Sequence, residues 1–180
     1  MAAQKKTSKK SATDRLRELA RTASVMLDGE EVLRIVSPRA MEYISSPVKG
    51  YRFMTNDYFD VDHEIFIRTK KTMKRLARLT DIPCSMALWL PAQGAPKYMT
   101  IVVHNGTVNR YWQFGSYRTE MPNEVRSCLK SGTVRSAPGS GSTNMITVLA
   151  PVFDSLEDTV AVLEISALDP ARAAKSRQYF

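Results

Sequence analysis

The hydrophobic period of this chain changes once, near Pro83, and that change divides it into a helical first half and a β-rich second half. Before Pro83, apolar residues recur every three or four positions, whereas after it they alternate or form short runs rich in β-branched and aromatic residues. Strands that follow one another without intervening long helices pair antiparallel, since parallel neighbours need a crossover. We therefore predict an α+β fold, an antiparallel β-sheet with helices packed on one face.

The first half predicts a series of helices. Thr13-Asp14 is suited to cap a helix that runs to about Leu27, and Ser37-Pro38 is suited to begin another. Helices are expected over 13–27, 30–36, 38–45 and, after a loop at 48–59, over 62–79. The last of these has an apolar stripe and a strongly cationic remainder. The stripe consists of Ile65, Phe66, Thr69, Met73, Leu76 and Leu79.

The second half predicts strands broken by turn signals and by one short helix. Asn105-Gly106 is a strong turn dipeptide, and Gly132 stops the short helix expected over 122–130. Strands are expected over 84–90, 98–104, 108–114, 133–136, 144–153 and 159–167. The first two strands and the last two each form a predicted hairpin.

Composition and charge predict four segments. Residues 1–12 are a disordered basic tail, 13–56 a small N-terminal helical extension, 57–168 the main domain, and 169–180 a polar C-terminal tail. The formal net charge is +8, and half of it comes from Lys5, Lys6, Lys9 and Lys10. A flexible basic tail is attracted to any polyanion, so charge leaves nucleic acid or an acidic protein open as a partner.

The sequence favours a cytoplasmic protein. A secretory signal requires an apolar stretch after its basic residues, and the basic N-terminus of this sequence is not followed by one. No apolar run approaches the roughly 18 residues needed to cross a bilayer. We expect no membrane partner. Cys84 and Cys128 belong to no paired-cysteine motif, so reduced thiols are the simplest interpretation.

Catalytic and metal-binding signals are weak. The residues Asp57, Asp60, Asp62, His63 and Glu64 have the chemistry of metal ligands, but acidic residues at a helix start are also favoured by the helix dipole. The loop Gly139–Ser142 lacks the lysine of a phosphate-binding loop. No nucleophile is paired with a base. We predict no metal and no enzymatic activity, and no cofactor can be named.

A ligand pocket is predicted from aromatic and polar residues near the expected sheet. Trp112 and Tyr117 are favoured because they border the glycine- and serine-rich loop, and Trp89 lies in the first expected strand. His104 ends the second strand, and the guanidinium of Arg118 suits an anionic ligand. For each of these residues, core packing or ordinary solvent exposure is the alternative.

In the predicted order of helices and strands, three stretches resemble a GAF domain, the small-molecule sensor fold related to PAS. They are the hairpin CSMALWLPAQGAPKYMTIVVHNG behind a long helix, the element MPNEVRSCLKSGTVRS, and the closing hairpin NMITVLAPVFDSLEDTVAVLEIS. The resemblance covers residues of about 57–168. It implies a ligand pocket between the sheet and its crossing helices and loops, and often a homodimer formed through terminal helices.

The resemblance favours a non-enzymatic sensory or regulatory domain that binds a small molecule and signals through its helices or a protein partner. Free methionine sulfoxide reductases are also lone GAF-type domains, but the glycine-flanked catalytic cysteine of that group is missing from VRSCLKS, which contains Cys128. The alternative function is a protein or nucleic-acid interaction module that uses the basic tail and the cationic helix over 62–79.

Overall fold

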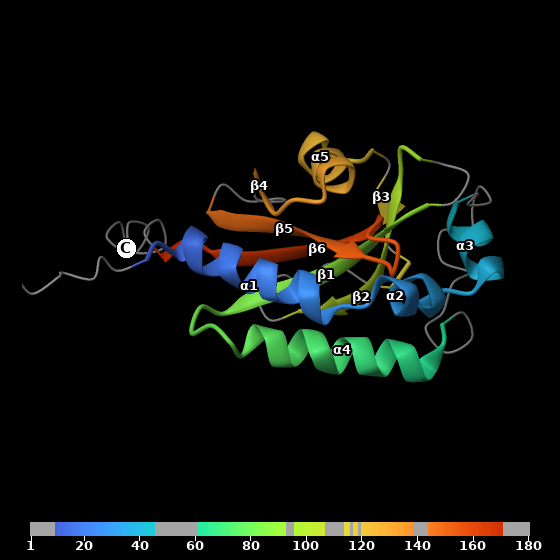
Figure 1. The fold of residues 1–180 in the computed structure, drawn as a ribbon, viewed down its shortest axis with the longest axis horizontal. Coiled ribbons are helices and arrows are strands. Elements are labelled where there is room, and N and C mark those ends of the chain that lie inside the picture. The colour runs from blue at the N-terminus through green and yellow to red at the C-terminus, as the bar shows by residue number, and fades with distance from the viewer. Residues whose placement is uncertain are drawn as a thin grey trace, which may run out of the picture.

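The structure, a computed structural model, describes residues 10–45, 61–92, 96–106, 114–115, 117–118, 120–138 and 144–170. This part of the chain forms a sheet flanked by helices (Figure 1). The helices are α1 (Ala12–Met26), α2 (Gly29–Ile35), α3 (Pro38–Ser45), α4 (His63–Ala77) and α5 (Asn123–Ser131). The strands are β1 (Cys84–Pro91), β2 (Met99–Asn105), β3 (Tyr117–Arg118), β4 (Arg135–Pro138), β5 (Met145–Phe153) and β6 (Thr159–Leu168).

Among the described residues, the six strands form one sheet in the order β3-β2-β1-β6-β5-β4. Every neighbouring pair is antiparallel. The hairpins β1-β2 and β5-β6 are each local, and they join at the centre of the sheet where β1 pairs with β6, placing Met86 opposite Ile165. The predicted α+β fold with an antiparallel sheet is confirmed.

Side-chain caps define where the helices begin. Asp28 accepts a hydrogen bond from the backbone N–H of Glu30 at 2.9 Å, and Asp62 accepts one from that of Ile65 at 3.1 Å. The cap of α1 is Ser11, whose hydroxyl accepts from the N–H of Asp14 at 3.1 Å, so the helix starts earlier than the predicted cap at Thr13-Asp14. A serine three residues before an acidic residue satisfies an otherwise unpaired N–H at the helix start.

The C-terminal end of α4 corrects one predicted core residue. The helix ends at Ala77, Arg78 caps it, and Leu79 is 67% exposed instead of completing the buried stripe. The chain turns away here, and Ile82, which is 8% exposed, supplies the buried apolar side chain at this position. The other five residues of the predicted stripe are buried.

Helices cover both faces of the sheet. Figure 1 shows α1, α2 and α4 on one side and α5 on the other. The prediction that helices pack on one face is therefore correct for α1, α2 and α4. It did not include α5, which forms a second, smaller layer on the other face. The physical reason is that both sets of alternating strand residues contain large apolar side chains: Leu88 and Leu163 face α1, α2 and α4, while Trp89, Ile101 and Leu149 face α5.

The N-terminal helices belong to the core of the sheet. Leu16, Leu19, Ala20 and Ala23 of α1 are buried in the same apolar cluster as residues of β5 and β6. Val32 and Ile35 of α2 join that cluster as well. The segment predicted as a helical extension over 13–56 therefore contains helices that share one core with the sheet, and a boundary at residue 57 does not separate two cores.

The edges of the sheet differ most from the predicted strands. The third strand expected over 108–114 lies outside the described residues except for Phe114, which is in a turn. The strand that the structure describes at this edge is β3, which consists of Tyr117 and Arg118. They pair with Thr100 and Met99 of β2. On the other side, α5 ends at Gly132 as predicted, in the left-handed region with φ 59°, and leads into edge strand β4.

Candidate functional site: a polar cluster on the α5 face of the sheet

Four polar or amphipathic side chains meet at the centre of the α5 face, and we call Trp89, Glu164, Ser166 and Thr147 the central polar cluster. The indole Nε1–H of Trp89 donates to Oε2 of Glu164 at 2.9 Å. The hydroxyl of Ser166 donates to Oε1 of the same carboxylate at 3.2 Å, and it lies 3.2 Å from the hydroxyl of Thr147. Three strands, β1, β5 and β6, thus contribute to one hydrogen-bonded group.

Strand register explains how these residues meet. On β6, Val162, Glu164 and Ser166 alternate onto the α5 face, because successive strand side chains point to opposite sides. Trp89 lies directly opposite Val162, which makes it a diagonal neighbour of Glu164 and within reach of its carboxylate. A shift of the register by one residue would turn Glu164 into the α1 face and break the cluster.

Glu164 is the most unusual residue of the cluster, because it is a carboxylate only 3% exposed. A buried carboxylate is costly unless hydrogen bonds or an opposite charge compensate it. The two donors from Trp89 and Ser166 give that compensation, and each oxygen of the carboxylate receives one of them. The cluster is therefore a fixed polar group within an apolar sheet, oriented toward the α5 layer.

His104 lies on the same face and in the same row as Glu164. Both residues are direct partners of Ala87, His104 from β2 and Glu164 from β6. Two strand spacings separate their backbones, which is roughly 10 Å. The methyl group of Ala87, the smallest side chain of this row, lies between the imidazole of His104 and the carboxylate of Glu164.

The α5 layer covers the apolar part of this face. Val125 and Cys128 of α5 and Met121 before it pack against Ala87, Trp89 and Leu149. Burial raises the pKa of the Cys128 thiol to about 12, against the opposing effect of the Arg135 charge, so this cysteine is a protonated core residue and no nucleophile at neutral pH. Cys84, on the opposite face of the sheet, is likewise buried, and burial raises its pKa to about 11.

The structure places the predicted ligand-binding residues as follows. Trp89 is on β1, 1% exposed, and His104 is on β2, so these two share the α5 face. Tyr117 and Arg118 form β3 at the edge of the sheet beside β2, and only their backbone pairing is described. Trp112 lies outside the described residues. The assignment of these five residues to a ligand site stays a prediction.

Sequence reasoning missed Glu164, Ser166 and Thr147. The available signal was the single charged residue in the run VAVLEISAL, at a position whose period-2 neighbours point into the protein. A lone acidic residue inside a strand of this kind indicates either an edge position or a buried partner. Its partner Trp89 is 75 residues away in the sequence, so the pairing is visible only once the strand order is known.

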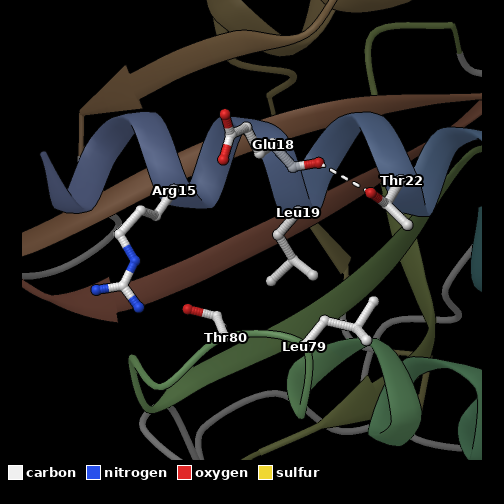
Figure 2. Close-up of a pocket in the computed structure, with 6 residues that line it drawn as sticks. All are labelled: Arg15, Glu18, Leu19, Thr22, Leu79 and Thr80. Carbon is white, nitrogen blue, oxygen red and sulfur yellow. Dashed lines mark hydrogen bonds between the residues drawn. The ribbon is translucent and has the colours of Figure 1, made fainter. Parts of the chain in front are cut away.

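A separate hollow of about 170 Å³ lies at the surface between α1 and the end of α4 (Figure 2). In Figure 2, Leu19 and Leu79 reach toward each other across it, while Arg15 points toward Thr80 and Glu18 points away. Drug-sized ligands occupy pockets of about 300–1,000 Å³, so this hollow is small for one. It lies on the helical side of the sheet away from the central polar cluster.

The described residues contain neither a metal-binding group nor a membrane-spanning helix. No three histidine, cysteine, aspartate or glutamate side chains in this part of the chain are grouped as a metal site requires. Asp62, from the acidic run considered above, caps α4 instead. None of the described helices combines the length and the apolar character that crossing a membrane demands.

Comparison with known proteins gives fold-level likenesses only. No protein-family model and no curated protein sequence matches the chain. Similar solved structures include the GAF domain region of a putative membrane protein from Geobacter sulfurreducens PCA, with 9% identity over 58% of this chain and 76% of that chain and a TM-score of 0.44. Another is a GAF domain with 11% identity over 84% and 82% of the two chains, also with a TM-score of 0.44.

The ligand-binding domain of the Campylobacter jejuni chemoreceptor Tlp3, solved in complex with L-valine, matches with 9% identity over 87% of this chain and 59% of that chain, at a TM-score of 0.37. Likenesses of this size carry no conclusion about ligand or activity. The structure contains the order of elements on which the resemblance to a GAF domain rests: a long helix precedes a hairpin, and a short helix capped by Gly132 leads into an edge strand and a closing hairpin.

Proposed function

We propose that this protein is a non-enzymatic sensory or regulatory domain that binds a small polar molecule on the α5 face of the sheet. The observation that carries the proposal is the buried carboxylate of Glu164, held by Trp89 and Ser166 on the face of the sheet that α5 covers. Folding alone gains little from such a group, because a buried charge at best offsets its own desolvation. A fixed polar group among aromatic and apolar side chains is typical of ligand sites.

The ligand would lie beneath α5, over Ala87 and between His104 and Glu164. Because the α5 layer packs against Ala87, binding there would require α5 to move. The imidazole and the carboxylate offer hydrogen-bonding groups on two sides, and Trp89 offers an aromatic surface beside them. Tyr117 and Arg118 of β3, together with Trp112, would complete the site from the β2 edge. Occupation would be transmitted through α5, which packs on the same face, and from there to a partner or to a second copy of the chain.

A thermal-shift screen of the full chain against amino acids, nucleotides, small carboxylates and haem-type cofactors tests the proposal. A ligand that binds only the native state at 100 times its Kd stabilises it by about 2.7 kcal/mol, so the melting temperature should rise in a saturable way. Glu164→Gln keeps the volume and removes the charge, and it should abolish the shift. Glu42→Gln, the same change at an exposed position of α3, should leave it intact.

Two outcomes would contradict the proposal. A screen with no saturable shift over a cooperatively folded protein would remove the case for a ligand of these classes. A shift that survives in both Glu164→Gln and His104→Gln would place the ligand elsewhere, and the hollow beside Leu79 would be the next position to test.

A further inference from the structure

The exposed side of α4 carries four cations in one line, and we call Lys71, Lys74, Arg75 and Arg78 the cationic strip. Their spacing of three, four and seven residues places them on one side of the helix, and all four are exposed. The strip is roughly 10 Å long, at 1.5 Å of rise per residue. No acidic residue interrupts the sequence from Lys70 to Thr80.

The charges of the strip are not neutralised within the described part of the chain. The ion pairs there involve other cations: Arg68 pairs with Glu31 at 3.0 Å, Arg15 pairs with Asp81, and Lys10 pairs with Glu18. No side chain of the four residues of the strip has an ion pair or hydrogen bond with a described residue. Four like charges on one helix side repel one another, and an external polyanion relieves that repulsion.

A second set of cations precedes α1 in the sequence. The first turns of α1 lie beside the end of α4, as the hollow lined by Arg15 and Leu79 shows (Figure 2). The chain before Lys10 carries Lys5, Lys6 and Lys9. In the sequence, three further cations therefore precede the helix that begins beside the end of α4.

From these observations we propose that the cationic strip binds the phosphate backbone of double-stranded nucleic acid, without preference for base sequence. Protein interfaces have an apolar and aromatic centre depleted in lysine, whereas the strip has four cations and no apolar residue at its centre. Segments that bind a membrane surface add Trp, Phe or Leu to their cations, and residues 2–10 contain none. The strip also lacks an aromatic on which a single-stranded base would stack.

Fluorescence anisotropy with a labelled 20-base-pair duplex, titrated with the full chain at 50 to 200 mM KCl, tests the inference. Four phosphate contacts predict a slope of log affinity against log salt of about −3.6, which is a loss of about 150-fold over that range. Contacts from Lys5, Lys6 and Lys9 would steepen the slope. A duplex of scrambled sequence should bind equally well.

A matched pair of double variants locates the contact. Lys74→Gln/Arg75→Gln removes two contacts and should leave a slope shallower by about 1.8. Arg126→Gln/Lys130→Gln removes the same two residue types from the exposed side of α5, on the other face of the sheet, and should leave the slope unchanged. All four positions are exposed helix positions and glutamine is a good helix former, so both proteins should keep the parental melting temperature.

Three results would overturn the inference. One is the absence of duplex binding at 50 mM KCl, and another is an equal loss in the two double variants, which would indicate net charge alone. The third is binding to vesicles with one-third phosphatidylserine, or to polyglutamate, without binding to the duplex. Each of these is independent of ligand binding at Glu164, because α4 and the α5 face that contains the central polar cluster lie on opposite sides of the sheet.

Discussion

The two faces of the sheet are built from the same strands but contain different chemistry. Toward α1, α2 and α4, the residues of β1, β5 and β6 are all apolar, as in the series Met86, Leu88 and Leu90. Toward α5, the same strands carry the polar residues Glu164, Ser166 and Thr147 together with Trp89 and Leu149. The first face explains why the chain folds, while the second contains polar groups that folding does not require, and this is where we place the ligand.

The largest expected effect is on the apolar face. Leu163→Ala removes a fully buried side chain and should lower the free energy of unfolding by about 2–5 kcal/mol, because the cavity is only partly closed by relaxation. Leu156→Ala is the matched control, since Leu156 is 79% exposed in the turn between β5 and β6. Urea denaturation should show a change within about 0.5 kcal/mol for the control. Equal losses would mean that the α1 face is not the main core.

On the α5 face, the loss of a single hydrogen-bond donor should lower the free energy of unfolding. Trp89→Phe keeps most of the apolar surface but removes the Nε1–H that Glu164 accepts, which should cost about 1–3 kcal/mol. Glu164→Gln and the double variant complete a thermodynamic cycle. A coupling energy of about 0.5–3 kcal/mol is expected for residues in one buried hydrogen-bonded group. Additive effects of the two changes would show that the indole and the carboxylate do not interact in solution.

Local signals account for the parts of the fold that were predictable from sequence. The glycine stop at Gly132 and the two hairpins are encoded within a few residues, and the structure has all of them. The caps at Asp28 and Asp62 are equally local, although neither was predicted as a cap. The end of α4 was less predictable, because Leu79 continues the helical period although the backbone has already turned.

The candidate site depends on contacts between distant parts of the chain. The sequence indicated Trp89 and His104 as isolated candidates, and only the order β2-β1-β6 puts both on the face of Glu164. The placement of α5 was also a long-range effect. Its apolar residues Val125 and Cys128 fit either face, and it is the large side chains on the second face of the strands that require a cover there.

The two buried cysteines, one on each side of the sheet, should make the free energy of unfolding depend on pH. Burial raises the pKa of Cys84 from 9.0 to about 11 and that of Cys128 to about 12. Above pH 9 the unfolded chain loses these protons while the folded chain retains them, so the free energy of unfolding should fall as the pH rises from 9 toward 11. The urea midpoint should therefore drop less between pH 8 and pH 10 in Cys84→Ala/Cys128→Ala than in the parent. Identical drops would show that the thiols titrate alike in both states.

The smallest expected effect is a difference between the labelling rates of the two cysteines, which are buried by different helices. At pH 8 both thiols are protonated and buried, so labelling by a disulfide reagent requires local opening. Cys128 lies on the buried side of α5, a helix of nine residues, whereas Cys84 lies on β1, on the face that α1, α2 and α4 cover. We expect Cys128 to be labelled several-fold faster in Cys84→Ala than Cys84 is in Cys128→Ala. Equal rates would mean that both thiols become accessible only through global unfolding, and α5 would then be too firmly packed to transmit the binding of a ligand beneath it.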